Sequence, residues 1–265
     1  MVVDCGGGTV DLTVRRLLSD DRLAETTERS GDFCGGTYVD DEFLKYLENR
    51  VGKPAMNKLR EKHYNQINYL VHKFFCPEIK IPFAGDRSKF KNIELDIEKK
   101  CPALKQYVTG SERQQLSDED EWLIDLDFDT VKSFFDPVIN KILRLIEMQL
   151  SKCPDCSVMF LVGGFSESKY VQSRIRQRFA NQLEIASRLA DHFFFFFKVK
   201  IEIHNFSIII VPPNPAAAIV RGACEYGLDM KTVTTRVLKW SYGVLIYPEW
   251  VSIIQPKNQK INYPK

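Results

Sequence analysis

Short stretches in which apolar and polar residues alternate open the chain. They cover residues 2–5, 10–18 and 23–30, and they predict a meander of three strands. The first connection contains Gly6, Gly7 and Gly8, and the second is the polar sequence Ser-Asp-Asp. The alternating residues 78–83, 91–97 and 123–129 predict further half-buried strands, the last of them after an acidic turn.

Apolar residues that recur every three or four positions predict the helices. They cover residues 39–51, 54–75 and 130–152, and the last stripe is the most regular, which is typical of a packed core. A strand, a glycine pair and a helix follow at 158–179. A buried strand, prolines and an Ala-rich helix then cover 208–227, and strands are expected within 236–247. These elements together indicate the α/β class.

Five consecutive phenylalanines stand in the β-prone segment 191–206, which contains few charges. Natural sequences avoid such a run because it aggregates when exposed. Two interpretations stay open: part of the segment is translated non-coding sequence, or it is a buried strand of unusual composition.

The composition is that of a globular chain with a balanced charge. Of its 265 residues, 44% are hydrophobic and 27% charged, with a formal net charge of +2, so electrostatics imply neither a nucleic acid nor a membrane partner. No long apolar span or signal peptide is present, and we expect a cytoplasmic protein. Seven scattered cysteines suit reduced thiols, and Cys153 and Cys156 are expected in a loop between a helix and a strand.

The sequence Asp-Cys-Gly-Gly-Gly-Thr-Val-Asp at 4–11 carries the candidate chemistry. It is not a P-loop, because no Gly-Lys-Ser/Thr follows and the next residues alternate like a strand. A glycine turn between two strands lets several N–H groups converge on a phosphate. Asp4 and Asp11 would then need a hard cation such as magnesium between them, and Thr9 adds a hydroxyl. A plain glycine-rich hairpin is the alternative.

A second glycine element strengthens the nucleotide interpretation. Gly163 and Gly164 follow a strand and precede a helix, which is one way to hold an adenosine from the opposite side of a cleft. The two glycine elements together predict one nucleotide between them.

Four sequences, in this order, resemble the nucleotide-binding domain of the 70 kDa heat-shock chaperones. They are DCGGGTVDLTV, SGDFCGGTYVDDEFLKYL, FLVGGFSESKYVQ and PPNPAAAIVRGA. The helix FFDPVINKILRLIEMQL and the ending TRVLKWSYGV are most similar to the divergent class-12 branch. The resemblance implies an actin-like ATPase (ribonuclease H-like) fold, mainly its second lobe with an incomplete first lobe. It also implies a partial nucleotide-binding domain at 1–230, a small subdomain at about 38–126 and the start of a β region at 231–265.

The resemblance implies roles for individual residues. Asp4, Thr9 and Asp11 match catalytic positions, and Asp4 and Asp11 also match the magnesium site. The matches to positions that bind ATP or ADP are Gly6, Gly7, Gly8, Thr9, Gly35, Gly36, Gly163, Gly164 and Phe165.

Departures from the family pattern limit what is carried over. Phe165 and Glu167 replace the usual serine and arginine of the adenosine motif, and Lys73 is the nearest match to the base-contacting set but fits a solvated helix-end charge. The family's first phosphate motif and catalytic lysine would precede residue 1, so Met1 is expected at an interior position of the domain.

The resemblance implies slow ATP hydrolysis in the family and at best weak nucleotide binding by this chain, with clients or regulatory proteins as further partners. Two alternatives remain. One is a pseudo-ATPase module for protein interaction or regulation, and the other is a sugar or acetate kinase, for which no substrate base is recognised. Exposed apolar surface is expected to make the chain poorly soluble.

Overall fold

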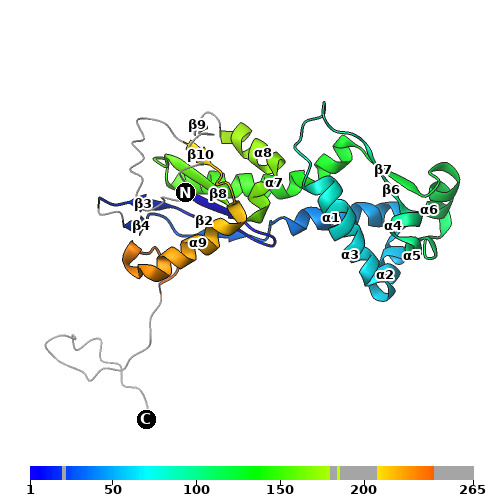
Figure 1. Cartoon of the computed structure of the whole chain (residues 1–265), viewed down its shortest axis with the longest axis horizontal. Coiled ribbons are helices and arrows are strands. Elements are labelled where there is room, and N and C mark those ends of the chain that lie inside the picture. The colour runs from blue at the N-terminus through cyan, green and yellow to red at the C-terminus, as the bar shows by residue number, and fades with distance from the viewer. Residues whose placement is uncertain (20–21, 180–183, 186–207, 242–265) are drawn as a thin grey trace, which may run out of the picture.

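A mixed sheet organises the protein in a computed structural model that describes residues 1–19, 22–179, 184–185 and 208–241 (Figure 1). Its six strands are, in spatial order, β5 (Ser30–Asp32), β2 (Val10–Thr13), β1 (Val2–Cys5), β8 (Val158–Val162), β10 (Ile208–Ile210) and β9 (Glu184–Ile185). Strand β2 is antiparallel to both of its neighbours, β5 and β1, whereas β1, β8, β10 and β9 run parallel to one another. The carboxyl ends of β1 and β8 therefore meet at one edge.

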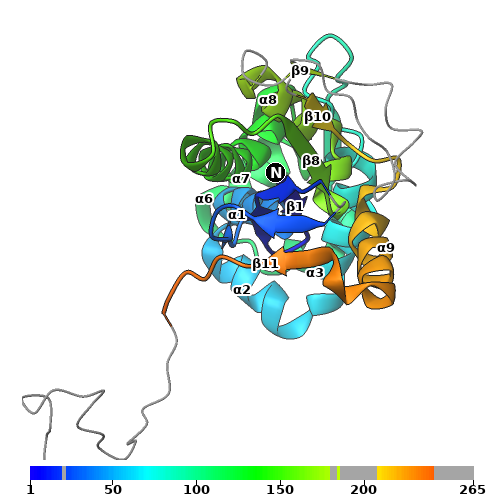
Figure 2. The same cartoon turned by 90° about the vertical axis from the view of Figure 1, so that its left-hand side faces the viewer.

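Long helices cover this sheet. Helix α7 (Phe128–Lys152) packs on β2 and β5, while α9 (Pro215–Leu228) packs beside β8, and Figure 2 shows the two helices on opposite sides of the sheet. Helix α8 (Lys169–Phe179) follows β8 through the short turn η3 (Gly164–Glu167) and contacts α7. No helix of the described residues is long and apolar enough to cross a membrane.

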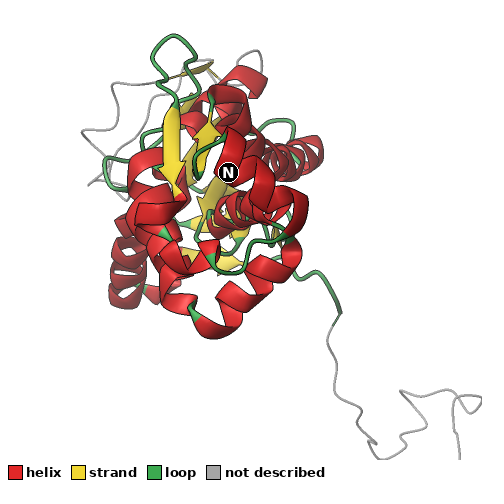
Figure 3. Ribbon diagram, turned by 90° about the vertical axis from the view of Figure 1, so that its right-hand side faces the viewer, coloured by secondary structure: helices red, strands yellow, loops and turns green. Residues whose placement is uncertain are grey.

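A helical subdomain lies at one end of the sheet and fills the foreground of Figure 3. It consists of α1 (Thr37–Val51), α2 (Lys53–Lys62), α3 (Tyr64–Tyr69), η1 (Leu70–Lys80), α4 (Ile97–Lys100), α5 (Pro102–Lys105), α6 (Gly110–Gln114), η2 (Gln115–Glu119) and the antiparallel pair β6 (Ile93–Asp96) and β7 (Leu123–Leu126). The strands predicted at 91–97 and 123–129 are thereby confirmed.

The prediction of a helix at 54–75 is confirmed in part, and one strand prediction in this subdomain is wrong. Residues 54–75 are helical except at His63, but they are divided among α2, α3 and the π-helix η1. The expected strand 78–83 is the end of η1 and a turn. Ile79 and Phe83 are buried while Ile81 is 70% exposed, so the burial repeats every four residues, as in a helix, and not every two.

The expected strand 10–18 is divided between two sheets. Residues up to Thr13 form β2, and β3 (Arg15–Leu17) joins a second sheet in the order β11-β4-β3, with β4 (Leu23–Glu25) and β11 (Val233–Thr235). The expected strand 23–30 divides in the same way into β4 and β5. Residues 236–241 are not in a strand. Residues 191–206 and 242–265 lie outside the described residues, so both interpretations of 191–206 stay predictions.

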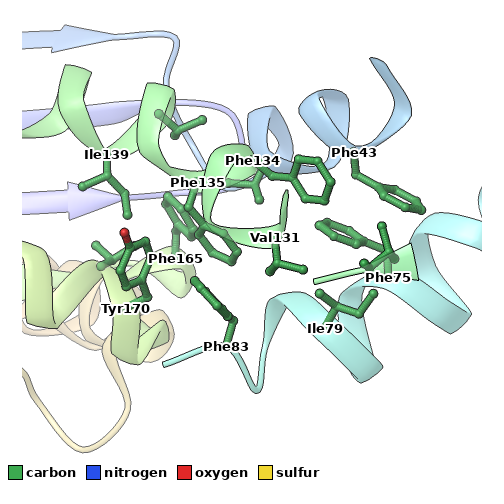
Figure 4. Close-up of a cluster of buried hydrophobic side chains, with 14 of the residues drawn as sticks. Phe43, Phe75, Ile79, Phe83, Val131, Phe134, Phe135, Ile139, Phe165 and Tyr170 are labelled. Atoms are coloured by element: carbon green, nitrogen blue, oxygen red, sulfur yellow. The ribbon is translucent and has the colours of Figure 1, made fainter. Parts of the chain in front are cut away.

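One aromatic core joins the sheet to the subdomain (Figure 4). Phe43 of α1 stacks on Phe75 of η1 with ring centroids 4.3 Å apart, and Phe134 of α7 meets both rings edge-on. Phe83 continues the cluster toward Tyr170 of α8. The subdomain is therefore packed against the same helix, α7, that covers the sheet.

The cysteines of the described residues are all free thiols, as expected. Cys153 and Cys156 lie in the loop between α7 and β8, which confirms their predicted position. Burial raises the pKa of the Cys5 thiol to about 12, so this residue behaves as an inert core side chain.

Candidate functional site

The glycine turn predicted at residues 6–9 connects β1 and β2 as a tight hairpin. The Gly6 N–H donates to the Thr9 carbonyl at 2.9 Å, and Asp4 lies directly opposite Asp11 in the antiparallel register. Opposite residues of neighbouring strands project to the same face of a sheet. The two carboxylates therefore share one face beside the turn.

The start of α1 binds the carbonyl groups of this turn. Backbone N–H groups donate from Gly35 to Gly8 at 3.1 Å, from Gly36 to Gly6 at 3.0 Å and from Thr37 to Gly7 at 2.8 Å. The Thr37 hydroxyl also donates to the Gly7 carbonyl at 2.9 Å. All three glycine carbonyls thus point toward α1.

The N–H groups of Gly7 and Gly8 remain available on the other side of the turn. Within the described residues neither donates a hydrogen bond to the protein. A side-chain carbon placed on either glycine would have no atom within 4 Å. Two free N–H groups on an open glycine turn form a surface that suits an anion.

Gly35 and Gly36 are close to the turn for a different reason than was expected. A Cβ on Gly35 would lie 2.7 Å from the Gly6 carbonyl oxygen, so only glycine allows the two segments to approach this closely. Their N–H groups are already bonded to the turn. In this structure the pair supports the glycine turn, and its predicted contact with a nucleotide stays a prediction.

Gly163 brings the second glycine element to the same place. Strand β8 pairs with β1 so that Asp4 lies beside Val162, and the next residue, Gly163, has a φ of +85° that favours glycine. A Cβ there would overlap the Asp4 carboxylate and would lie 2.5 Å from the Cys5 carbonyl oxygen. The Gly163 N–H donates to Pro215 at the start of α9 at 2.9 Å, whereas Gly164 faces open space.

The side chain of Phe165 is buried in the core, and its predicted contact with a nucleotide stays a prediction. It is 7% exposed and lies in the aromatic core (Figure 4). It also covers Gly36, whose Cβ would lie 3.2 Å from the ring. The ring therefore joins η3 to the start of α1. Lys73, the weak match to a base-contacting residue, is exposed on η1.

The electrostatics of the turn favour a cation beside the two carboxylates. Asp4 is partly buried, and burial raises its pKa, with the negative charge of Asp11 raising it further. The Thr9 hydroxyl donates to Asp11 at 3.0 Å. Burial and like charge both disfavour the ionised form, so a divalent cation beside the two carboxylates would offset this electrostatic cost.

The donor set fits magnesium better than a metal held by protein ligands alone. In the part of the chain that the structure describes, no group of three or more His, Cys, Asp or Glu residues could hold a metal ion. Magnesium commonly takes one or two carboxylates and completes its shell with water and substrate phosphates. Asp4 and Asp11 meet that requirement.

Thr37 and Pro215 contribute to the site although no role was predicted for them. Thr37 follows the Gly-Gly pair directly, so the sequence Gly-Gly-Thr could have indicated it. The carbonyl of Pro215 could not have been found in the same way, because its contact with Gly163 depends on the packing of α9 beside β8.

Comparison with known proteins identifies relatives. Residues 1–191 match the family described as a domain of unknown function (DUF8340). The chain is 28% identical to the human protein named heat shock 70 kDa protein 12A over 264 residues and 27% identical to its mouse counterpart, and each alignment covers 95% of the chain and 35% of the relative. It is 23% identical to human heat shock 70 kDa protein 12B over 270 residues, with 95% and 34% covered.

The chain thus spans about a third of the length of these curated relatives. The predicted resemblance to the class-12 branch of the 70 kDa heat-shock proteins is confirmed, and the mixed α/β fold is consistent with an actin-like ATPase. Because the family match covers residues 1–191, this chain belongs to the DUF8340 family and is a relative of the class-12 heat-shock 70 kDa proteins.

Proposed function

We propose that this chain binds a magnesium nucleotide at the edge of the sheet where β1 and β8 end. The observation that carries the proposal is that three glycine elements meet at the end of β1: the pair at 35–36 donates to the turn that follows Asp4, and Gly163 lies against the Asp4 carboxylate. The turn at 6–9, the pair at 35–36 and Gly163 are far apart in the sequence, and two of the three leave no room for a side chain.

The glycine turn would receive the phosphates. Its carbonyls are bonded to α1, so its free N–H groups at Gly7 and Gly8 are fixed in direction before any ligand arrives. Fixed donors bind an anion without an ordering cost at the moment of binding. Gly164, which faces open space, leaves room for the rest of the nucleotide near the end of β8.

Asp4 and Asp11 would hold the magnesium ion, which when bound would neutralise phosphate charge. Asp4 is the more restricted of the two, because Gly163 lies against its carboxylate and burial limits its contact with water. A carboxylate held in this way can also orient a water molecule toward a phosphate. Thr9 would keep Asp11 directed toward the turn through its hydroxyl.

The resemblance to the 70 kDa heat-shock family supports ATP as the nucleotide and a chaperone-like role. On this proposal the six-stranded sheet and the helical subdomain form the second lobe of an actin-like ATPase fold. Residues 1–230 then belong to the nucleotide-binding domain, with a subdomain at about 38–126. Hydrolysis and client proteins are parts of the same proposal, and they rest on the resemblance to the 70 kDa heat-shock family and not on contacts of this chain.

Titration with a fluorescent ATP analogue tests the proposal, with magnesium in one series and a chelator in the other. We expect saturable binding that requires magnesium. Asp4→Asn is expected to weaken it by roughly tenfold or more, because one of two metal ligands is lost.

Asp125→Asn is the matched control, since Asp125 is an exposed carboxylate on β7 in the subdomain. Its binding curve should overlay that of the unmodified chain. Equal weakening by both variants, or binding that ignores the chelator, would count against the site. No binding at all would favour the protein-interaction module over a nucleotide-binding protein.

A further inference from the structure

A buried carboxylate on the second sheet lies among three arginines. The Glu25 side chain on β4 is 2% exposed, and Arg29 donates to its Oε1 atom from Nε at 3.1 Å and from Nη2 at 2.7 Å. The nearest guanidinium nitrogens of Arg15 and Arg236 each lie 3.9 Å from the same oxygen. Three positive groups therefore share one negative group.

Among the described residues, the neighbouring carboxylates do not neutralise the positive charge of these three arginines. Glu28 is paired with Lys152 at 2.7 Å, and Asp155 lies 3.6 Å from Arg16. Each of these carboxylates thus has its own cation. The cluster of Arg15, Arg29 and Arg236 around Glu25, here called the arginine cluster, keeps a surplus of two positive charges.

The cluster also has hydrogen-bond donors without acceptors. A separation of 3.9 Å is too long for a hydrogen bond, so Arg15 and Arg236 attract Glu25 without bonding to it. The second carboxylate oxygen of Glu25 already accepts the Val237 N–H at 3.0 Å. The Nε atom of Arg15 is buried and has no acceptor among the described residues.

The charges of the cluster affect one another. Burial lowers the pKa of Arg15, Glu25 opposes this shift, and the guanidiniums of Arg29 and Arg236 lower the pKa further. A buried donor that lacks a partner is costly, and so is a set of like charges held together. A second anion beside the exposed parts of these guanidinium groups would lower the cost of the like charges.

We propose that the arginine cluster is a binding site for a phosphate-type dianion. Two negative charges match the surplus of the cluster, and guanidinium groups bind tetrahedral oxyanions through paired N–H donors. The side chains of Arg15, Arg29 and Arg236 are 30%, 52% and 49% exposed, so an anion reaches them from solvent. The site lies on the sheet β11-β4-β3, apart from the glycine turn on the main sheet (Figure 1).

The test follows the Arg15 Nε–H signal by nitrogen–proton NMR during titration of the full chain with inorganic phosphate. Chloride at the same ionic strength serves as the comparison. We expect the signal, identified by its absence in Arg15→Lys, to move and saturate with phosphate and to stay in place with chloride. Arg236→Gln should raise the half-saturating phosphate concentration by roughly tenfold, the effect of losing one charge-assisted hydrogen bond.

Arg87→Gln is the control, because Arg87 is an exposed arginine that pairs with Asp129 and is not part of the arginine cluster. It should leave the titration unchanged. Arg236→Lys keeps the charge but not the paired donors, so intermediate weakening is expected even if Arg236→Gln disturbs β11. Identical movement with phosphate and chloride, or a titration that neither Arg236 variant changes, overturns the proposal.

Separate titrations with O-phosphoserine and with glycerol 3-phosphate identify the source of the group. Tighter binding of the first than of inorganic phosphate indicates a phosphorylated protein, and tighter binding of the second indicates a lipid headgroup. Equal binding of all three indicates free phosphate. Failure of the nucleotide proposal at the glycine turn would leave these results unaffected, because the two sites share no residue.

Discussion

Gly163 lies against Asp4, and no other residue type fits between the end of β8 and this carboxylate. The contact arises because β8 is parallel to β1 and places Val162 beside Asp4, so the following residue must turn away with a positive φ. A glycine near the middle of the chain thereby fixes the position of a carboxylate at its start.

Replacing Asp4 by Asn should stabilise the chain at neutral pH when no metal is present. The folded state raises the pKa of Asp4, so it binds a proton more strongly than the unfolded state, and ionisation of Asp4 lowers stability as pH rises through the folded pKa. The uncharged amide avoids that loss. Denaturant unfolding should show the gain at pH 7.

Lowering the pH provides the internal control for Asp4. The advantage of Asp4→Asn should shrink as the pH falls, and it should vanish below the ordinary pKa of aspartate, where the acid is protonated in both states. A gain that is constant with pH would mean that the amide acts through a new contact instead of through charge. Asp125→Asn, at an exposed position on β7, should leave the free energy of unfolding at pH 7 unchanged.

Ala substitutions at Gly35 and Gly8 should have opposite consequences for stability and binding. A Cβ at Gly35 collides with the backbone of the glycine turn, so Gly35→Ala should destabilise the chain by about 1–3 kcal/mol. A Cβ at Gly8 meets no atom of the chain, so Gly8→Ala should keep its stability within about 1 kcal/mol but obstruct the face proposed for the phosphates.

Thermal unfolding and nucleotide titration of both variants separate these effects. The expected pattern is a lowered unfolding temperature for Gly35→Ala and weakened binding with normal unfolding for Gly8→Ala. If Gly8→Ala binds nucleotide as the unmodified chain does, the phosphate position proposed for the turn is wrong.

The Phe165 side chain should matter for stability in proportion to its burial. Phe165→Ala removes a ring that is 7% exposed, and such truncations cost about 3–5 kcal/mol. Phe33→Ala is the comparison, because Phe33 is 68% exposed and should change stability by no more than about 0.5 kcal/mol. Equal losses by urea unfolding would contradict the assignment of Phe165 to the core.

Gly85 and Gly110 should respond differently to alanine although both have positive φ values. Gly85 has a φ of +74°, and a Cβ there would lie 2.5 Å from Tyr170 Cε2, so Gly85→Ala carries both backbone strain and a collision. Gly110 has a φ of +70° and a nearest contact of 3.4 Å, so strain alone is expected, about 1 kcal/mol.

Denaturant unfolding of these two variants tests whether the loop that follows the π-helix η1 is part of the core. Phe83 packs edge-on against Tyr170, so displacement of that ring by Gly85→Ala should loosen both side chains. Gly85→Ala should therefore unfold at clearly lower denaturant than Gly110→Ala. A similar loss for both variants would show that the loop gives way without disturbing Tyr170.

The sequence predicted features that depend on local pattern. The apolar stripe at 130–152 indicated α7 because its period persists over many turns, and no tertiary contact could easily override it. The glycine elements also stood out, since runs of glycine between two aspartates are informative by themselves. The ordered set of motifs was sufficient to recognise the family, which the comparisons confirm.

Short apolar runs were less informative because strands and helix ends share them. Residues 78–83 alternate in sequence but are buried every fourth position, and only the packing of Ile79 and Phe83 against α7 and its neighbours reveals this. The division of 10–18 at Val14 likewise depends on which sheet each half joins, and strand pairing is a long-range property.

The sequence by itself determined which glycines and carboxylates form the candidate site, because their types and spacing are local facts. Only the tertiary structure decided what each of them does. Gly35 donates to the turn, Gly163 restrains Asp4, and Phe165 fills the core, because hydrogen bonds and packing join residues that are distant along the chain. The arginine cluster on Glu25 has the same origin, since Arg236 meets Arg15 only where β11 lies beside β4.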